Sequence, residues 1–102
     1  MAFSKPNLYP KDAKIISRFA FALGHAARVT ILEQLAVNGP CSVEQLSKNH
    51  PISQPALSYH LKILREAHLV EWREKFPYTY YKLDKKNVTL AEIYLGSFFK
   101  KI

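Results

Sequence analysis

Apolar residues recur every three or four positions in two early segments, over residues 11–23 and 26–37. This spacing places them on one face of an α-helix, so it predicts a helix in each segment. Gly24 stops the first helix, and the Asn38-Gly39-Pro40 run stops the second. Residues 1–10 contain two prolines and no such periodicity, and we expect them to form a flexible arm.

Two serines mark the starts of the next two helices. Ser42 and Gln45 have the spacing of a capping box, in which each side chain accepts a hydrogen bond from the other residue's backbone N–H. Ser53 precedes a proline that falls in the first turn, where a missing N–H costs little, and this helix runs to about Ala67. The pattern therefore predicts a short third helix and a longer fourth one, with Asn49-His50-Pro51 between them.

The hydrophobic period changes after residue 68. Residues 69–74 and 78–83 are rich in aromatic and β-branched residues, and the pair Phe76-Pro77 separates them. Two such segments joined by a short break are typical of a β-hairpin.

A last helix follows the hairpin. We expect it to begin near Asn87 or Thr89, because Thr89 and Glu92 have the spacing of another capping box. The order is then ααααββα, mainly α with a small β-hairpin. Two short helices joined by a tight turn and followed by a hairpin predict a winged helix-turn-helix domain over residues 11–102.

The fourth helix has an apolar face and a polar face. At about 100° per residue, one stripe is apolar and consists of Leu57, Leu61 and Leu64. Gln54, Ser58 and Lys62 form a second stripe to one side, and Tyr59 lies nearly opposite the leucines. Glutamine can contact adenine in a bidentate manner, serine can bond base edges, and lysine neutralises phosphate. A helix with this outward face suits the major groove of DNA.

The composition limits the class of protein. The 102 residues carry 15 Lys and Arg against 8 Asp and Glu, a formal charge of +7 that points to nucleic acid or another polyanion as partner. The chain is 48% hydrophobic, which suffices for one folded domain. Cys41 is the only cysteine, which excludes an intrachain disulfide and a zinc finger and indicates the reducing cytoplasm. The sequence shows no secretory signal and no apolar run of about 18 residues, so we expect no membrane contact. It also shows no catalytic triad, so we expect no enzyme activity.

Three segments carry a recognisable pattern. They read LGHAARVTILEQLA at residues 23–36, SVEQLSKNHPISQPALSYHLKILREAHLV at 42–70 and YYKL at 80–83. Over about residues 15–83 the chain resembles the arsenic-repressor (ArsR) family of bacterial winged-helix transcription factors, and the most specific part is SQPALSYHLKILR at residues 53–65. The resemblance implies a homodimeric repressor that binds a partly palindromic DNA operator, and in many members a ligand releases the DNA.

The resemblance also implies which residues contact DNA and which contact the partner subunit. It implies that Gln54, Ser58 and Tyr59 contact DNA bases, and that Val43 lies at a position that can approach the groove. Basic residues of the hairpin are placed to touch the flanking backbone or the minor groove. The full set expected at DNA is Val43, Gln54, Pro55, Ser58, Tyr59, Lys62, Arg65, Arg73, Lys75 and Lys82. The set expected at the dimer interface, on the first and last helices, is Ile15, Phe19, Ile93, Tyr94, Phe98 and Phe99.

The chain departs from the metal-sensing members of that family. Their cysteine pair at the third helix falls here on Ser42 and Glu44, and residues 87–102 contain Glu92 but no His, Cys or Asp. Because Zn²⁺ takes about four N, S or O ligands, we expect no metal site and no cofactor. The identity of the effector stays open, and the alternatives include a small apolar compound and a redox signal at Cys41.

Several residues have more than one interpretation. His60 beside the leucine stripe is interpreted as a packed, hydrogen-bonded histidine rather than a metal ligand. Arg28 suits either a phosphate contact or a structural role. The tyrosines at 78, 80 and 81 suit packing of the hairpin or stacking on bases. An alternative for the whole domain is a winged-helix module that binds proteins and never touches DNA.

Overall fold

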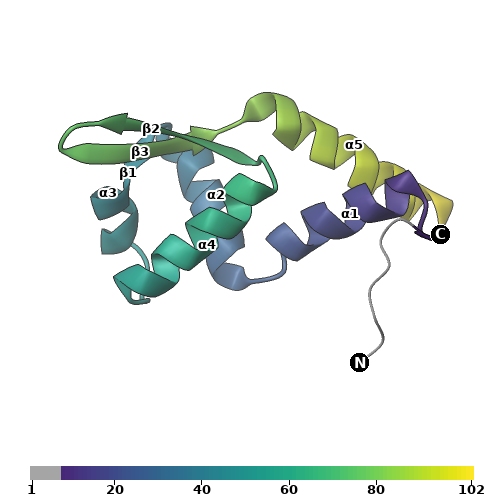
Figure 1. The fold of residues 1–102 in the computed structure, drawn as a ribbon, viewed down its shortest axis with the longest axis horizontal. Helices are drawn as coiled ribbons and strands as arrows, with labels where there is room; N and C mark the ends of the chain where they lie inside the picture. The colour runs from purple at the N-terminus through teal and green to yellow at the C-terminus, as the bar shows by residue number, and fades with distance from the viewer. Residues whose placement is uncertain (1–7) are drawn as a thin grey trace.

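The computed structural model describes residues 8–102 (Figure 1). Its helices are α1 (Lys11–Ala22), α2 (Ala26–Asn38), α3 (Val43–Lys48), α4 (Gln54–Glu66) and α5 (Lys85–Lys101). Its strands are β1 (Cys41–Ser42), β2 (Val70–Lys75) and β3 (Tyr78–Leu83). The predicted order of elements is confirmed with one addition, the short strand β1 between α2 and α3. Of the arm expected over residues 1–10, residues 1–7 lie outside the described part of the chain.

Both predicted serine caps are confirmed. The Ser42 hydroxyl accepts a hydrogen bond from the N–H of Gln45 at 3.1 Å, and the Gln45 side chain accepts one from the N–H of Ser42 at 2.8 Å. The Ser53 hydroxyl accepts from the N–H of Ala56 at 3.3 Å. These bonds satisfy backbone donors that have no partner inside the helix, and they fix where α3 and α4 begin.

The start of the last helix is a correction to the sequence prediction. α5 begins at Lys85 rather than at Asn87 or Thr89, because Asp84 is its N-cap. The Asp84 carboxylate accepts from the backbone N–H of Asn87 at 3.2 Å and from its side-chain amide at 2.9 Å. A carboxylate at this position satisfies a free N–H and also meets the positive end of the helix dipole.

The three strands form one antiparallel sheet in the order β1-β3-β2. Phe76 and Pro77 form the turn of the β2–β3 hairpin, as the sequence predicts, and Trp72 pairs with Tyr81 across it. β1 pairs with β3 through only two residues, Cys41 and Ser42. A strand of two residues has no alternating pattern, so sequence periodicity does not reveal it.

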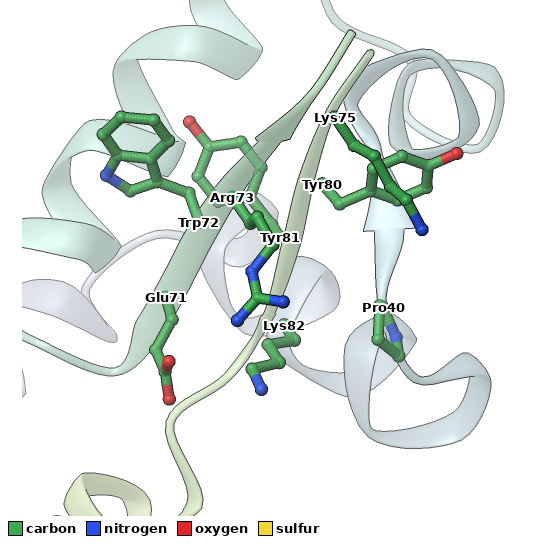
Figure 2. A pocket seen from close by; sticks show the side chains of 8 residues that line it. All are labelled: Pro40, Glu71, Trp72, Arg73, Lys75, Tyr80, Tyr81 and Lys82. Carbon is green, nitrogen blue, oxygen red and sulfur yellow. The ribbon is translucent and has the colours of Figure 1, made fainter.

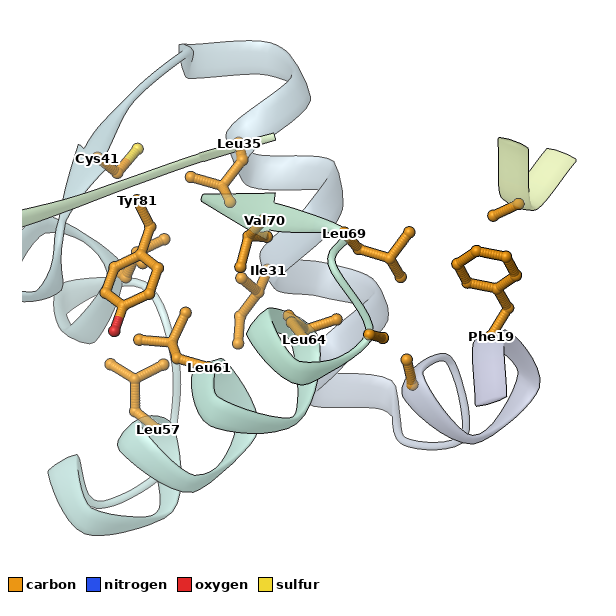
Figure 3. Close-up of a cluster of buried hydrophobic side chains, with 14 residues drawn as sticks. Phe19, Ile31, Leu35, Cys41, Leu57, Leu61, Leu64, Leu69, Val70 and Tyr81 are labelled. Atoms are coloured by element: carbon orange, nitrogen blue, oxygen red, sulfur yellow. The ribbon is translucent and has the colours of Figure 1, made fainter. Parts of the chain in front are cut away.

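The core lies between α4, α2 and the inner face of the sheet (Figure 3). The predicted leucine stripe is confirmed: its members are almost fully buried, and they are Leu57, Leu61 and Leu64. Ile31 and Leu35 of α2 face them, and Tyr81 covers them from β3. Tyr78 and Tyr80 instead form an edge-to-face pair with ring centroids 6.2 Å apart. Tyr81 is therefore a core residue, and it is not available for stacking on bases.

α1 and α5 pack against each other at the end of the molecule away from the hairpin (Figure 1). Phe19 of α1 is 6% exposed and belongs to the same buried cluster as Ala91 of α5. Within residues 8–102, no single helix is long and apolar enough to cross a membrane. α1 and α2 pass that test of length and composition only as a pair, and they are bent by 86° at the break between them.

Candidate nucleic-acid interface

The polar face of α4 is exposed. Gln54, Ser58 and Lys62 all lie on the surface, and 53% of Tyr59 is accessible to solvent. Pro55 is exposed in the first turn of the same helix. Because the leucines on the other face anchor α4 in the core, the helix presents these polar groups as one rigid surface. The structure therefore brings together the α4 residues that the sequence predicts at DNA, apart from Arg65.

Two of the predicted contact residues are partly engaged within the protein. The Arg65 guanidinium lies over the ring of Trp72, 5.3 Å from its centroid, and its side chain is half-buried. Val43, the first residue of α3, is half-buried against the hydrophobic core. These side chains contribute to holding α4 and α3 in place, and they offer less free surface than the α4 stripe does.

The basic residues of the hairpin gather on the outer face of the sheet. Arg73, Lys75 and Lys82 are exposed there, and together with Tyr80 and Pro40 they line a groove of about 410 Å³ (Figure 2). Trp72 points to the other side of the hairpin, as the alternation of side chains along a strand requires. Glu71 also lines this groove, so one carboxylate partly offsets its three basic side chains and the net charge of the lining is positive.

Phe76 at the tip of the hairpin has an exposure that the sequence pattern did not single out. Its side chain is 98% exposed, the most exposed large apolar group of the described chain. It stands next to Lys75 and Pro77. The pattern identified Phe76 only as a break between strands, because exposure at a turn leaves no periodic signal.

A buried arginine supports the polar helix from beneath. Arg28 in α2 is 5% exposed, and its guanidinium donates to the carbonyls of Phe21 and Ala22, each at 2.9 Å. A third N–H group faces Nδ1 of His60 in α4, also at 2.9 Å. Of the two roles left open for Arg28, the structure therefore supports the structural one. The interpretation of His60 as a packed, hydrogen-bonded residue is confirmed.

Burial changes the acid–base properties of three groups near α2 and α4. It lowers the pKa of His60, and repulsion of the imidazolium form by His25, Arg28 and His50 lowers it further. Burial also lowers the pKa of His50, whose Nε2 lies 3.0 Å from the Gln34 side-chain oxygen. Burial raises the pKa of the Cys41 thiol, which donates to the Gly39 carbonyl at 3.4 Å. A buried, protonated thiol is a packing residue and a poor nucleophile.

The helices α1 and α5 carry the residues predicted at a dimer interface, but in two different environments. Ile93 is 56% exposed and Phe99 68% exposed, while Ile15, Tyr94 and Phe98 are half-buried. Phe19 lies in the hydrophobic core of the chain itself and has almost no surface left for an interface. Three further apolar side chains of these helices are exposed and were absent from the prediction, namely Phe21, Leu90 and Ile102.

Metal ligands are not gathered in the described part of the chain. Over residues 8–102, no three His, Cys, Asp or Glu side chains lie close enough to hold a metal ion. The rings of His25 and His60 have centroids 4.4 Å apart and are tilted by 45°. The Nδ1 atom of His25 already accepts from the backbone N–H of Ala27, and that of His60 contacts Arg28.

Comparison with known proteins identifies the family. Residues 25–71 match the model of the arsR family of bacterial regulatory proteins. The chain is 36% identical over 80 residues to an HTH-type transcriptional regulator of Mycobacterium tuberculosis, which covers 78% of this chain and 74% of that protein. It superposes on NolR of Sinorhizobium fredii with a TM-score of 0.67 and 32% identity, covering 93% and 98% of the two chains. The transcriptional repressor BigR of Xylella fastidiosa gives a TM-score of 0.67 and 29% identity, covering 89% and 92%. This chain therefore belongs to the arsR family and is a transcriptional regulator with a winged helix-turn-helix fold.

Proposed function

We propose that this regulator is a homodimeric repressor that reads a partly palindromic operator through α4. The observation that carries the proposal is the outward face of α4, where Gln54, Ser58, Tyr59 and Lys62 are exposed above a helix whose other face is anchored in the core. A rigid helix with amide, hydroxyl and ammonium groups on its free face matches the donors and acceptors of the major groove.

Each part of this surface has a distinct task in the proposed complex. Gln54 and Ser58 contact base edges, and Lys62 contacts phosphate. The wing, which we define as the hairpin of β2 and β3, places Arg73, Lys75 and Lys82 on the backbone beside the major groove. Because phosphate contacts release counterions, binding should weaken steeply as salt rises.

The exposed apolar groups of α1 and α5 support the homodimer. Ile93 and Phe99 are largely exposed although both are large and apolar, and both lie on α5. Burying such groups against a second copy removes apolar surface from water. A two-fold dimer presents two copies of α4, which predicts operator half-sites about one helical turn apart.

Repression rather than activation is supported by what relatives are called. A biofilm growth-associated repressor of Xylella fastidiosa is 34% identical over 73 residues, and an arsenical resistance operon repressor of Bacillus subtilis is 36% identical over 67 residues. The positions that hold cysteines in metal-sensing members carry Ser42 and Glu44 here. We therefore propose a repressor that does not use these metal sites for release.

Selection of bound DNA from a random pool tests the proposal. We expect an enriched, partly palindromic site, which fluorescence anisotropy then shows to bind more tightly than scrambled DNA. Sedimentation equilibrium should give a dimer. A pool without enrichment, together with equal affinity for all sequences at low salt, would contradict the repressor and favour the protein-interaction module. Repeating the selection with cell extract would reveal a releasing ligand.

A further inference from the structure

Arg28 joins three helices, two of which, α1 and α4, have different tasks in the proposed function. It belongs to α2, its guanidinium holds the carbonyls of Phe21 and Ala22 at the end of α1, and it contacts His60 in the middle of α4. All three contacts measure 2.9 Å. One side chain thus connects a helix of the proposed dimer interface with the helix proposed to read DNA.

The environment of Arg28 explains how a buried cation is tolerated there. The last carbonyls of a helix lack intrahelical partners and carry the negative end of its dipole. Phe21 and Ala22 stand at that end of α1, whose last turn holds no basic residue of its own. The Phe21 ring also lies below the guanidinium, 5.2 Å from its centre to the ring centroid. Arg28 therefore acts as the missing cation for α1 while it reaches α4.

The contact with His60 fixes the protonation state of that histidine. An arginine side chain has only donors, so Nδ1 of His60 must accept and the imidazole must be neutral with its proton on Nε2. The ionisable groups facing His60 are His25 from the α1–α2 turn, Arg28 from α2, His50 from the segment after α3, and Tyr59 on α4 itself. A proton added to Nδ1 would meet a guanidinium N–H at hydrogen-bonding distance and would break the contact.

We propose that Arg28 and His60 form a positioning link that sets the orientation of α4 relative to α1, and that the link holds only while His60 is neutral. This inference rests on the proposed function, because the orientation matters for the spacing at which two copies of α4 meet an operator. Neither residue touches DNA. They act through α4, and they make spacing preference depend on pH.

The sign of the pH effect separates the link from simple electrostatics. Acidification adds positive charge to histidines, which strengthens binding to any DNA by attraction to phosphate. Loss of the contact between Arg28 and His60 instead weakens binding to the operator, because the two copies of α4 no longer fit both half-sites together. It does not weaken binding to other DNA. Weaker specific binding combined with unchanged or stronger non-specific binding is therefore the signature of the link.

Two variants of one residue provide a matched test. His60→Asn keeps an acceptor near the position of Nδ1 but cannot take up a proton, and His60→Leu has a similar size and no acceptor. Affinities are measured for the selected operator and for a version with one extra base pair between half-sites. The spacing preference is the ratio of the affinity for the original operator to that for the lengthened one. At pH 7.5, we expect this ratio to be about tenfold larger in wild type and His60→Asn than in His60→Leu. The difference is the effect of removing one hydrogen bond to a charged group.

The same measurement at lower pH tests the titration. Once NMR shows that His60 is protonated, the spacing preference of wild type should fall about tenfold, as expected for loss of the hydrogen bond between Arg28 and His60. The spacing preference of His60→Asn should stay the same. Equal pH dependence in wild type and His60→Asn would overturn the link. So would a folded His60→Leu protein that still discriminates between the two spacings.

A measurement without DNA distinguishes failure of this inference from failure of the proposed function. The carbonyls that Arg28 holds belong to the same peptide groups as the amides of Ala22 and Leu23. In wild type, we expect their NMR shifts to change with the titration of His60, and in His60→Asn this change should be absent. If selection finds no operator, the proposed function fails while the amides still test the link. If an operator exists and the amides do not follow His60, the link fails alone.

Discussion

The guanidinium of Arg65 lies over the indole ring of Trp72, 5.3 Å from the ring centroid. Arg65 stands in the last turn of α4 and Trp72 in β2, so the pair connects the proposed reading helix with the wing. The contact uses the face of a partly exposed ring, an arrangement that contributes about 0.5–1 kcal/mol at such sites.

Trp72→Ala should therefore lower the free energy of unfolding by about 1 kcal/mol, because it removes both the cation–π interaction and the packing of the indole ring. Trp72→Phe keeps an aromatic face and should recover most of this stability. Urea unfolding followed by circular dichroism measures both. As a control, Phe76→Ala alters a side chain that is 98% exposed, and its effect should stay within about 0.5 kcal/mol. If the Ala and Phe variants of Trp72 are equally stable, the ring face contributes nothing.

The fold could be predicted from sequence where local signals agree with burial. Ser42 and Ser53 have side chains that compete directly for helix-starting N–H groups, and both caps are confirmed. The predicted start of α5 was wrong because Asp84, which the prediction did not consider, caps the helix three residues before Asn87 and five before Thr89. A local pattern cannot rank such caps, since the choice depends on where β3 ends and how α5 meets α1.

The polar face of α4 could be predicted because periodicity alone separates Gln54 and Ser58 from the leucines. The partners of Arg28 could not, because α1 and α4 meet at this residue only through the tertiary fold. The burial of Phe19 could not be predicted for the same reason. The resemblance placed this residue at a dimer interface, but the packing of α1 on α5 shows that it is buried within the chain.

Gln54→Ala should weaken operator binding by about 1–3 kcal/mol and relax the preference at one base pair. The reason is that a glutamine can pair with an adenine in a bidentate manner, and alanine leaves that base edge without a partner. Anisotropy with operators altered one base pair at a time measures the effect. An equal loss on every sequence would mean that Gln54 touches only the DNA backbone.

Lys62→Ala should instead weaken binding to all sequences alike. A lysine on phosphate releases about one counterion, so removing it should make the slope of log affinity against log salt less steep by about 0.9 for each protomer bound. Lys62→Arg preserves the charge and should keep the wild-type slope. An unchanged slope in the alanine variant would remove Lys62 from the set of phosphate-binding residues.

Stability should fall as the pH drops below about 6.5. Burial lowers the pKa of His50 and His60 below the ordinary value of 6.5, so the unfolded chain binds protons that the folded chain does not. Their contribution to stability is complete above pH 6.5 and is lost as the pH falls through this value toward the lower pKa of the folded state. Each group adds a slope of at most about 1.4 kcal/mol per pH unit.

Denaturant unfolding at a series of pH values tests this expectation. His60→Asn removes one titrating group and should flatten the curve below pH 6.5. His68→Asn is the matched control, because His68 is exposed and has a φ of 61°, a conformation that asparagine tolerates. The control should follow the wild-type curve. A His60→Asn curve as steep as the wild-type one would show that His60 does not contribute to the acid loss of stability.

Gly39→Ala should destabilise the protein by about 1–3 kcal/mol. Gly39 ends α2 with φ 73° and ψ −155°, a conformation open almost only to glycine, while its N–H donates to the Leu35 carbonyl at 2.9 Å. An added Cβ meets nothing within 4 Å, so backbone strain alone causes the loss. Gly96→Ala is the matched substitution, because Gly96 lies inside α5 with equally open space and should gain about 0.8–1 kcal/mol of helix propensity. Thermal unfolding of both variants measures the contrast, and a loss at Gly96 equal to that at Gly39 would contradict an origin in backbone conformation.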